Sequence, residues 1–161
     1  MRARPTARRR HASAREGEAR YEIAGGPVVV DASMAVLWFA NEPDPRQAAR
    51  LLERDAMLLA PDFMAVEATN AWWKKFRRRE MTVVEAEQAV TRLLALDIVW
   101  TTAATLLRPA VRLAAELGHP VYDCIYLALA ESDHCELLTA DDIFARRVRS
   151  SCPFIVSLKD L

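Results

Sequence analysis

The amino-acid sequence predicts an α/β fold, a three-layer α/β/α sandwich around a central, mostly parallel sheet. Short apolar runs such as VVV at 28–30 are typical of strands that are buried on both faces. Longer segments with helical periodicity separate these runs, and this alternation favours a parallel sheet. The chain has 161 residues, of which 52% are hydrophobic and 27% charged, enough for one globular core.

The expected elements alternate from residue 28 to residue 157. Strands are expected at 28–30, 57–59, 97–100, 137–139 and 154–157. Helices are expected at 33–40, 46–55, 62–79, 83–95, 103–117, 123–132 and 142–149. Gly118 and Pro120 stop the helix before them, because glycine ends helices and proline cannot continue one.

The first 26 residues differ in character from the rest of the chain. Residues 1–20 hold seven arginines and two glutamates, a charge of about +5, and because the whole chain is neutral the body carries about −5. Almost no apolar side chains are available for burial, so residues 1–26 are expected to be a disordered extension and residues 27–161 one domain. Two interpretations of the extension stay open: an electrostatic contact with RNA or DNA, or a stretch foreign to the native chain.

The chain is expected to be a cytoplasmic protein without a membrane segment. The apolar run 23–40 follows arginines, as in a secretory signal, but Asp31 lies in its middle and Gly25-Gly26-Pro27 interrupts its start. No other stretch approaches the ~20 apolar residues of a membrane span. The three cysteines form no CxxC motif and are expected to be reduced core residues, and His134-Cys135 lacks the second ligand pair of a zinc site.

Four carboxylates fall where local rules alone do not favour them. Asp31 follows the first strand directly, and Asp141 has the same topological place, between the fourth strand and the helix after it. Glu67 lies on the apolar face of its helix, where an unpaired charge is costly. Asp123 opens an almost wholly apolar helix. Local explanations exist for each, because the aspartates suit helix N-caps and the glutamate could extend to water.

Taken together, the four acids predict a metal site. In open α/β sheets ligands gather at the carboxyl edge, where Asp31 and Asp141 would lie, and the helices that carry Glu67 and Asp123 can reach the same crevice. Clustered carboxylates repel one another unless a cation neutralises them, and oxygen ligands select Mg²⁺ or Mn²⁺. Such centres serve phosphate chemistry. The pattern leaves open whether one or two ions bind, and whether Asp142 replaces Asp141.

Four motifs occur along the chain in this order: VVVDASMAV, APDFMAVEATNAW, HPVYDCIYLALA and LLTADDIF. In these motifs the sequence resembles the PIN-domain nucleases, and more closely the VapC-type toxins of bacterial toxin–antitoxin pairs. The resemblance covers residues 28–158. It implies a catalytic, metal-binding set of four acids: Asp31, Glu67, Asp123 and Asp141. It also implies three supporting polar residues: Ser33, Asn70 and Thr139. It also implies endoribonuclease cleavage of RNA with Mg²⁺ or Mn²⁺, an α/β/α sandwich, homodimerisation, and inhibition by a cognate antitoxin whose tail occupies the active-site groove.

A basic segment ends the helix that carries the predicted glutamate ligand. It consists of Lys74, Lys75, Arg77, Arg78 and Arg79. We interpret it as an RNA-binding surface that offsets the acidic centre, although cations are also common at helix C-termini. Because Trp72 and Trp73 are adjacent, only one of them can face the core. The other is expected at an antitoxin or dimer surface, or stacked on a base.

Other functions compete with a nuclease. A phosphatase with Asp31 as nucleophile usually carries a second acid two residues later, where this chain has Ser33. A receiver domain would need a lysine after a late strand, and that lysine is missing. The main alternative is a PIN-like domain that only binds RNA or a protein partner, although all four acids are present. His119, four residues before Asp123, could reach the acids, but a surface or capping role is expected.

Overall fold

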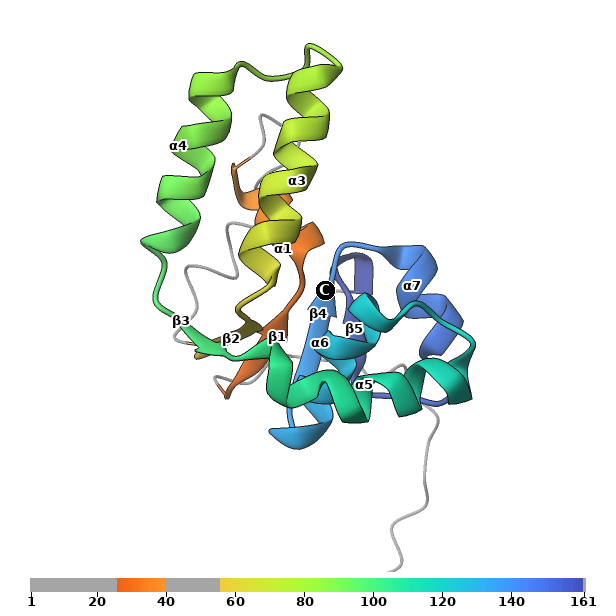
Figure 1. Ribbon diagram of the computed structural model, residues 1–161. Helices are drawn as coiled ribbons and strands as arrows, with labels where there is room; N and C mark the ends of the chain where they lie inside the picture. Colours follow the sequence, from red (N-terminus) through yellow and green to blue (C-terminus); the bar gives the residue numbers. More distant parts are fainter. Residues whose placement is uncertain (1–25, 40–55, 161) are drawn as a thin grey trace, which may run out of the picture.

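The computed structural model describes residues 26–39 and 56–160. The strands are β1 (Val28–Val30), β2 (Leu58–Pro61), β3 (Ile98–Thr101), β4 (Glu136–Thr139) and β5 (Ile155–Ser157). The helices are α1 (Ala32–Phe39), α3 (Met64–Arg77), α4 (Val83–Leu94), α5 (Ala103–Leu117), α6 (Val121–Ser132) and α7 (Asp142–Val148), and a 3₁₀ turn, η1 (Leu158–Asp160), follows β5. The predicted three-layer fold is confirmed, with an all-parallel sheet in the order β3-β2-β1-β4-β5 (Figure 1).

The centre of the sheet contains a topological switch point. From β1 the chain builds outwards to β2 and β3, and it then returns to place β4 and β5 on the other side of β1. Val30 pairs with Leu138, so the residues that follow β1 and end β4 lie next to one another. Ligand crevices of parallel α/β sheets form at such points, outside the carboxyl ends of the strands.

Helix α6 forms the centre of the core on one side of the sheet. Its residues 124–130 are all buried, it packs against β1, β2 and β4, and α5 covers it. A separate group consists of α1 and the α3–α4 hairpin, which extends well away from the sheet (Figure 1). Trp72 is fully buried whereas Trp73 is 47% exposed, which confirms that only one of the two indoles faces the core.

The boundaries of the elements agree with the prediction within about two residues at each end. Helix α5 ends at Gly118, whose φ of 59° is the left-handed conformation that glycine adopts easily. Helix α6 begins at Val121, earlier than predicted, because the fixed φ of Pro120 suits the residue that starts a helix. Asp123 therefore lies inside the first turn of α6 and is not its N-cap. The predicted helix at 46–55 lies outside the described residues.

No helix in the described ranges is long and apolar enough to cross a membrane.

Candidate active site

Asp31 is buried at the carboxyl end of β1 and accepts three hydrogen bonds. Its Oδ1 accepts from Ser33 Oγ at 2.5 Å and from the backbone N–H of Met34 at 3.2 Å. Its Oδ2 accepts from Thr139 Oγ1 at 2.6 Å, and only 7% of the residue is exposed. The Met34 contact is an N-cap of α1. Asp31 therefore caps a helix and is also fixed by the neighbouring strand.

Ser33 and Thr139 join the loops that follow β1 and β4. Ser33 Oγ accepts from the backbone N–H of Ala140 at 2.8 Å, and Thr139 Oγ1 accepts from the backbone N–H of Asp141 at 2.9 Å. Each hydroxyl thus donates to Asp31 and accepts from the loop that carries the fourth predicted acid. The two side chains hold Asp31 and the Asp141 loop in fixed positions relative to each other.

The two acids on helices each have one side-chain hydrogen-bond partner. Tyr126 of α6, which is 2% exposed, donates from its hydroxyl to Oε2 of Glu67 at 2.5 Å. Nε2 of His119 lies 2.8 Å from Oδ2 of Asp123. The imidazole stacks on Phe144 and its side chain is only 9% exposed. The expected surface role of His119 is therefore wrong, because α7 covers the ring.

The carboxylates influence one another's charge. Burial raises the pKa of Asp31 from 3.8 to about 6; the hydroxyls of Ser33 and Thr139 oppose this rise and the charge of Asp123 adds to it. Burial also raises the pKa of Glu67, with further repulsion from Asp123 and Asp31. The pKa of Asp123 is raised by burial and by the charge of Asp141, against the contact with its histidine. Glu67 and the three aspartates therefore form one electrostatic cluster.

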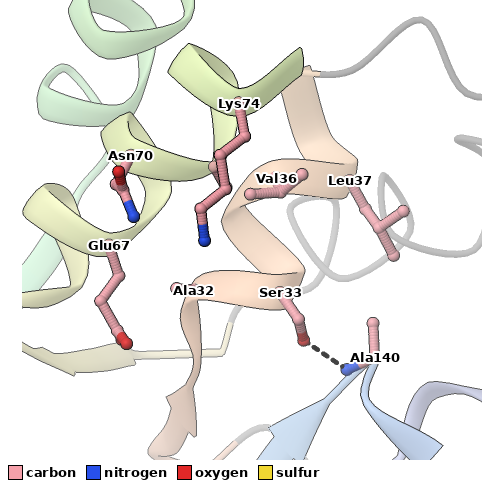
Figure 2. A pocket seen from close by; sticks show the side chains of 9 residues that line it. Ala32, Ser33, Val36, Leu37, Glu67, Asn70, Lys74 and Ala140 are labelled. Carbon is pink, nitrogen blue, oxygen red and sulfur yellow. Dashed lines mark hydrogen bonds between the residues drawn. The ribbon is translucent and has the colours of Figure 1, made fainter. Parts of the chain in front are cut away.

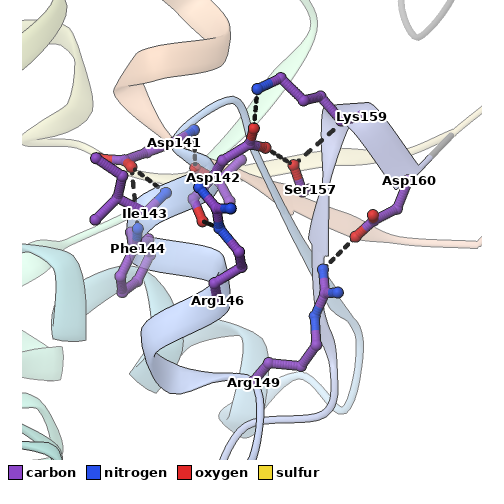
Figure 3. Close-up of polar contacts among 10 residues, drawn as sticks. Asp141, Asp142, Ile143, Phe144, Arg146, Arg149, Ser157, Lys159 and Asp160 are labelled. Atoms are coloured by element: carbon purple, nitrogen blue, oxygen red, sulfur yellow. Dashed lines mark hydrogen bonds and ion pairs between the residues drawn. The ribbon is translucent and has the colours of Figure 1, made fainter.

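Asp141 and Asp142 are adjacent but have different surroundings (Figure 3). Oδ1 of Asp141 caps α7 by accepting from the backbone N–H groups of Ile143 at 2.9 Å and Phe144 at 3.0 Å. The carboxylate of Asp142 accepts from Ser157 and pairs with Lys159. Hydrogen bonds from Lys159 and then Ser157 lower the pKa of Asp142. Of these two aspartates, Asp141 belongs to the cluster, because its negative charge raises the pKa of Asp123.

The donor set suits a hard divalent cation, although it does not enclose one as it stands. Among residues 26–39 and 56–160, no three acidic, histidine or cysteine side chains come together as a group that could hold an ion. Glu67 Oε1, Asp123 Oδ1 and Asp141 Oδ2 accept no hydrogen bond from this part of the chain. None of these three residues is fully buried, so side-chain rotation can bring free oxygens together. Oxygen ligands of this kind are those of Mg²⁺ and Mn²⁺.

A pocket of about 500 Å³ opens beside the acids, between α1 and α3 (Figure 2). One wall carries Glu67, Asn70 and Lys74 of α3. Helix α1 contributes the apolar side chains of Val36 and Leu37 and the hydroxyl of Ser33 to the lining. The predicted supporting residue at position 70 thus shares a pocket with the predicted glutamate ligand.

The basic residues predicted to bind RNA have different surroundings. Lys74 lines the pocket. The guanidinium of Arg77 lies 5.3 Å from the ring centroid of Trp73, a cation–π contact. Arg78 pairs with Glu80 at 2.8 Å. Lys74 therefore lies beside the acids, whereas Arg77 and Arg78 contact their own neighbours.

The fold and the site define a parallel α/β domain with an acidic cluster at the switch point of its sheet. Comparison with known proteins identifies the family of this domain. The family model of the PIN domain matches residues 28–149. Ribonuclease VapC3 of Pyrobaculum aerophilum is 34% identical over 124 residues, which are 74% of this chain and 93% of that protein. The chain therefore belongs to the PIN-domain family, and the resemblance inferred from the four motifs is confirmed.

Solved structures of low sequence identity share the fold. PAE2754 of Pyrobaculum aerophilum has a TM-score of 0.61 at 22% identity, covering 84% of this chain and 85% of that one. A toxin–antitoxin complex from Klebsiella pneumoniae has a TM-score of 0.59 at 18% identity, covering 81% and 97%. VapC20 of Mycobacterium tuberculosis, a toxin that cleaves the sarcin–ricin loop, has a TM-score of 0.56 at 16% identity, covering 74% and 94%.

Proposed function

We propose that this protein is a metal-dependent endoribonuclease that hydrolyses RNA phosphodiester bonds, and that it is the toxin of a toxin–antitoxin pair. The observation that carries the proposal is the electrostatic cluster of four carboxylates at the β1–β4 switch point. Family membership and a relative named as a ribonuclease support it. The alternative of a domain that only binds RNA or protein is not favoured, because the whole acidic set is present.

The side chains that would hold Mg²⁺ or Mn²⁺ are Asp31, Glu67, Asp123 and Asp141. Bound there, the ion supplies charge stabilisation for the phosphate and a lower pKa for the attacking water. Ser33 and Thr139 keep Asp31 in one orientation from two sides. Tyr126 does the same for Glu67. These hydrogen bonds orient Asp31 and one oxygen of Glu67, so the rearrangement required when metal binds falls mainly on Asp123, Asp141 and the second oxygen of Glu67.

We also infer an antitoxin partner and a homodimer. The relative's VapC name and the toxin–antitoxin complex of similar fold support the antitoxin. The α3–α4 hairpin exposes Val66, Trp73, Phe76 and Val83, all of them more than 40% exposed. Clusters of exposed aromatic and aliphatic side chains mark protein interfaces. This surface supports a protein contact at the hairpin.

A cleavage assay tests the ribonuclease proposal. Purified full-length protein is incubated with structured RNA in Mg²⁺ or Mn²⁺, with EDTA and the Asp31→Asn variant as controls. Asp97→Asn is the matched variant, because it removes an exposed carboxylate in the turn before β3. We expect discrete fragments that require both metal and Asp31, and wild-type cleavage by Asp97→Asn.

Two results would contradict the proposal. Equal cleavage by the wild type and Asp31→Asn would identify the activity as contamination. A folded, metal-loaded wild type that cuts no RNA from a varied panel would favour the domain that only binds.

A further inference from the structure

We propose that the pocket between α1 and α3 is a nucleotide subsite, which receives one unstacked nucleotide of single-stranded RNA, and that Lys74 binds the phosphate of that nucleotide. The inference rests on the proposed ribonuclease function and specifies how that substrate is held. It makes Lys74 a substrate-binding residue distinct from the rest of the basic segment.

The spacing along α3 places Lys74 on the same helix face as a predicted metal ligand. Glu67, Asn70 and Lys74 stand at positions i, i+3 and i+7, which share one face of a helix. At 1.5 Å per residue, Lys74 lies about 10 Å further along the helix axis than Glu67. The side chain of Lys74 reaches back from that position along the pocket toward Glu67 (Figure 2), so its amine can meet a phosphate close to the acids.

The chemistry of the pocket matches that of a single nucleotide. Val36 and Leu37 offer an apolar wall to the face of a base, and the amide of Asn70 can hydrogen-bond to a base edge. The volume of about 500 Å³ suits a compact ligand. A base can reach such a wall only when it is not stacked in a duplex, so the pocket selects single-stranded segments or loops.

Lys74 is available for a phosphate in a way that Arg77 and Arg78 are not. Its amine extends along the pocket wall between α3 and α1 (Figure 2), and it forms no ion pair with the described residues. Arg77 covers Trp73, and Arg78 pairs with Glu80. A cation beside the acidic cluster favours the binding of a flanking phosphate of the polyanion.

The experiment measures cleavage kinetics and RNA binding for the same set of variants. Fluorescence anisotropy of a short, labelled single-stranded RNA gives Kd at several salt concentrations, in an Asp31→Asn background that prevents cleavage. Kinetics in the presence of Mg²⁺ or Mn²⁺ give kcat and KM. The variants are Lys74→Ala, Lys74→Arg and Ala71→Leu, which adds bulk to the pocket wall without a change of charge. The matched control is Arg112→Ala, which removes an exposed positive charge on α5.

We expect Lys74→Ala to raise Kd and KM about five- to tenfold, with little change in kcat, because a charge-assisted contact to the substrate is lost. The slope of log K against log salt should flatten by about 0.7, the contribution of one contact to single-stranded nucleic acid. Lys74→Arg should retain most of the affinity. Ala71→Leu should raise KM while the salt slope stays unchanged. Arg112→Ala should match the wild type.

The subsite is overturned if the wild type cuts RNA and Lys74→Ala has the same KM and salt slope as Arg112→Ala; the pocket would then be assigned to a protein partner. If the wild type neither binds nor cuts RNA, the proposed ribonuclease function fails and the subsite fails with it. Circular dichroism checks that each variant is folded. If Ala71→Leu unfolds, the comparison of Lys74→Ala with Lys74→Arg still tests the subsite.

Discussion

The Asp31→Asn substitution is expected to stabilise the folded protein at neutral pH while it removes a proposed metal ligand. The carboxyl has a pKa of about 6 in the folded protein, against 3.8 ordinarily, chiefly because it is buried. Since one pKa unit corresponds to about 1.4 kcal/mol, ionised Asp31 lowers the free energy of unfolding by about 3 kcal/mol above pH 6. An amide has one acceptor oxygen where the carboxylate has two, so one hydroxyl partner must rotate, at a cost of about 1 kcal/mol. The net gain is about 2 kcal/mol.

The gain depends on pH in a defined direction. Below pH 3.8 the carboxyl is protonated in both the folded and the unfolded chain, so aspartic acid and asparagine behave alike. As the pH rises from 3.8 through about 6, the wild type loses stability because only its unfolded state ionises freely. The asparagine variant does not titrate, so its advantage grows across this window and is constant above it.

Urea unfolding in EDTA, followed by circular dichroism at pH 7.5 and pH 3.5, measures this difference. With a slope of about 2 kcal/mol per molar urea, the midpoint of Asp31→Asn should lie about 1 M above that of the wild type at pH 7.5. The two midpoints should approach each other at pH 3.5. Asp97→Asn controls for the loss of a negative charge as such. An Asp31→Asn variant no more stable than the wild type at pH 7.5 would refute the reasoning. A difference between the two urea midpoints that is the same at both pH values would refute it as well.

Three further outcomes are expected. Mg²⁺ or Mn²⁺ at ten times its Kd should raise the free energy of unfolding of the wild type by about 1.4 kcal/mol; thermal melts of Asp31→Asn should show a clearly smaller rise, and an equal rise would place the ion elsewhere. Tyr126→Phe removes the hydrogen bond that lowers the pKa of Glu67, so kcat should fall about tenfold and the acidic limb of the pH–rate profile should move to higher pH; an unchanged profile would argue against this role. Thr82→Ala deletes the capping box of α4, so urea titration should show a loss of about 1 kcal/mol with cleavage unchanged; wild-type stability would contradict it.

The strands could be predicted because strands buried on both faces leave a local signal. Val28-Val29-Val30 is an uninterrupted β-branched run, and the structure buries all three residues fully. The pairing of β1 with β4 has no such signal, since Val30 and Leu138 are far apart in sequence and meet only in the folded sheet. The sequence therefore predicts which residues end strands, while the position of the switch point comes from long-range packing.

The partners of the helical acids were less predictable. Tyr126 lies in an almost wholly apolar helix and Glu67 in a costly position, and the structure explains both residues by one hydrogen bond between them. A buried phenol and a carboxylate on an apolar face each need a partner, so the two observations together could have predicted the contact. His119 was misjudged because the turn that carries it is polar in sequence, whereas Phe144, far along the chain, covers it.

The basic segment shows the limit of reasoning from composition. Five cations within six positions suggest one continuous patch, but successive helical residues point about 100° apart around the axis. Lys74 has the i+7 relation to Glu67 and lines the pocket, whereas Arg77 lies against Trp73. Helical phase, rather than the number of charges, decides which cation shares a surface with the acids.

The partners of the clustered acids are uncharged or weakly basic, and this has a chemical consequence. In the described part of the chain, the carboxylates of Asp31 and Glu67 accept from hydroxyl groups, and no lysine or arginine pairs with any of the four acids. A lysine or arginine would stabilise these carboxylates more strongly, but it would also compete with a divalent cation for the same oxygens. Neutral donors fix the direction of the oxygens and leave their negative charge available. The nearby cation Lys74 lies along the pocket, where a substrate phosphate rather than a carboxylate can become its partner.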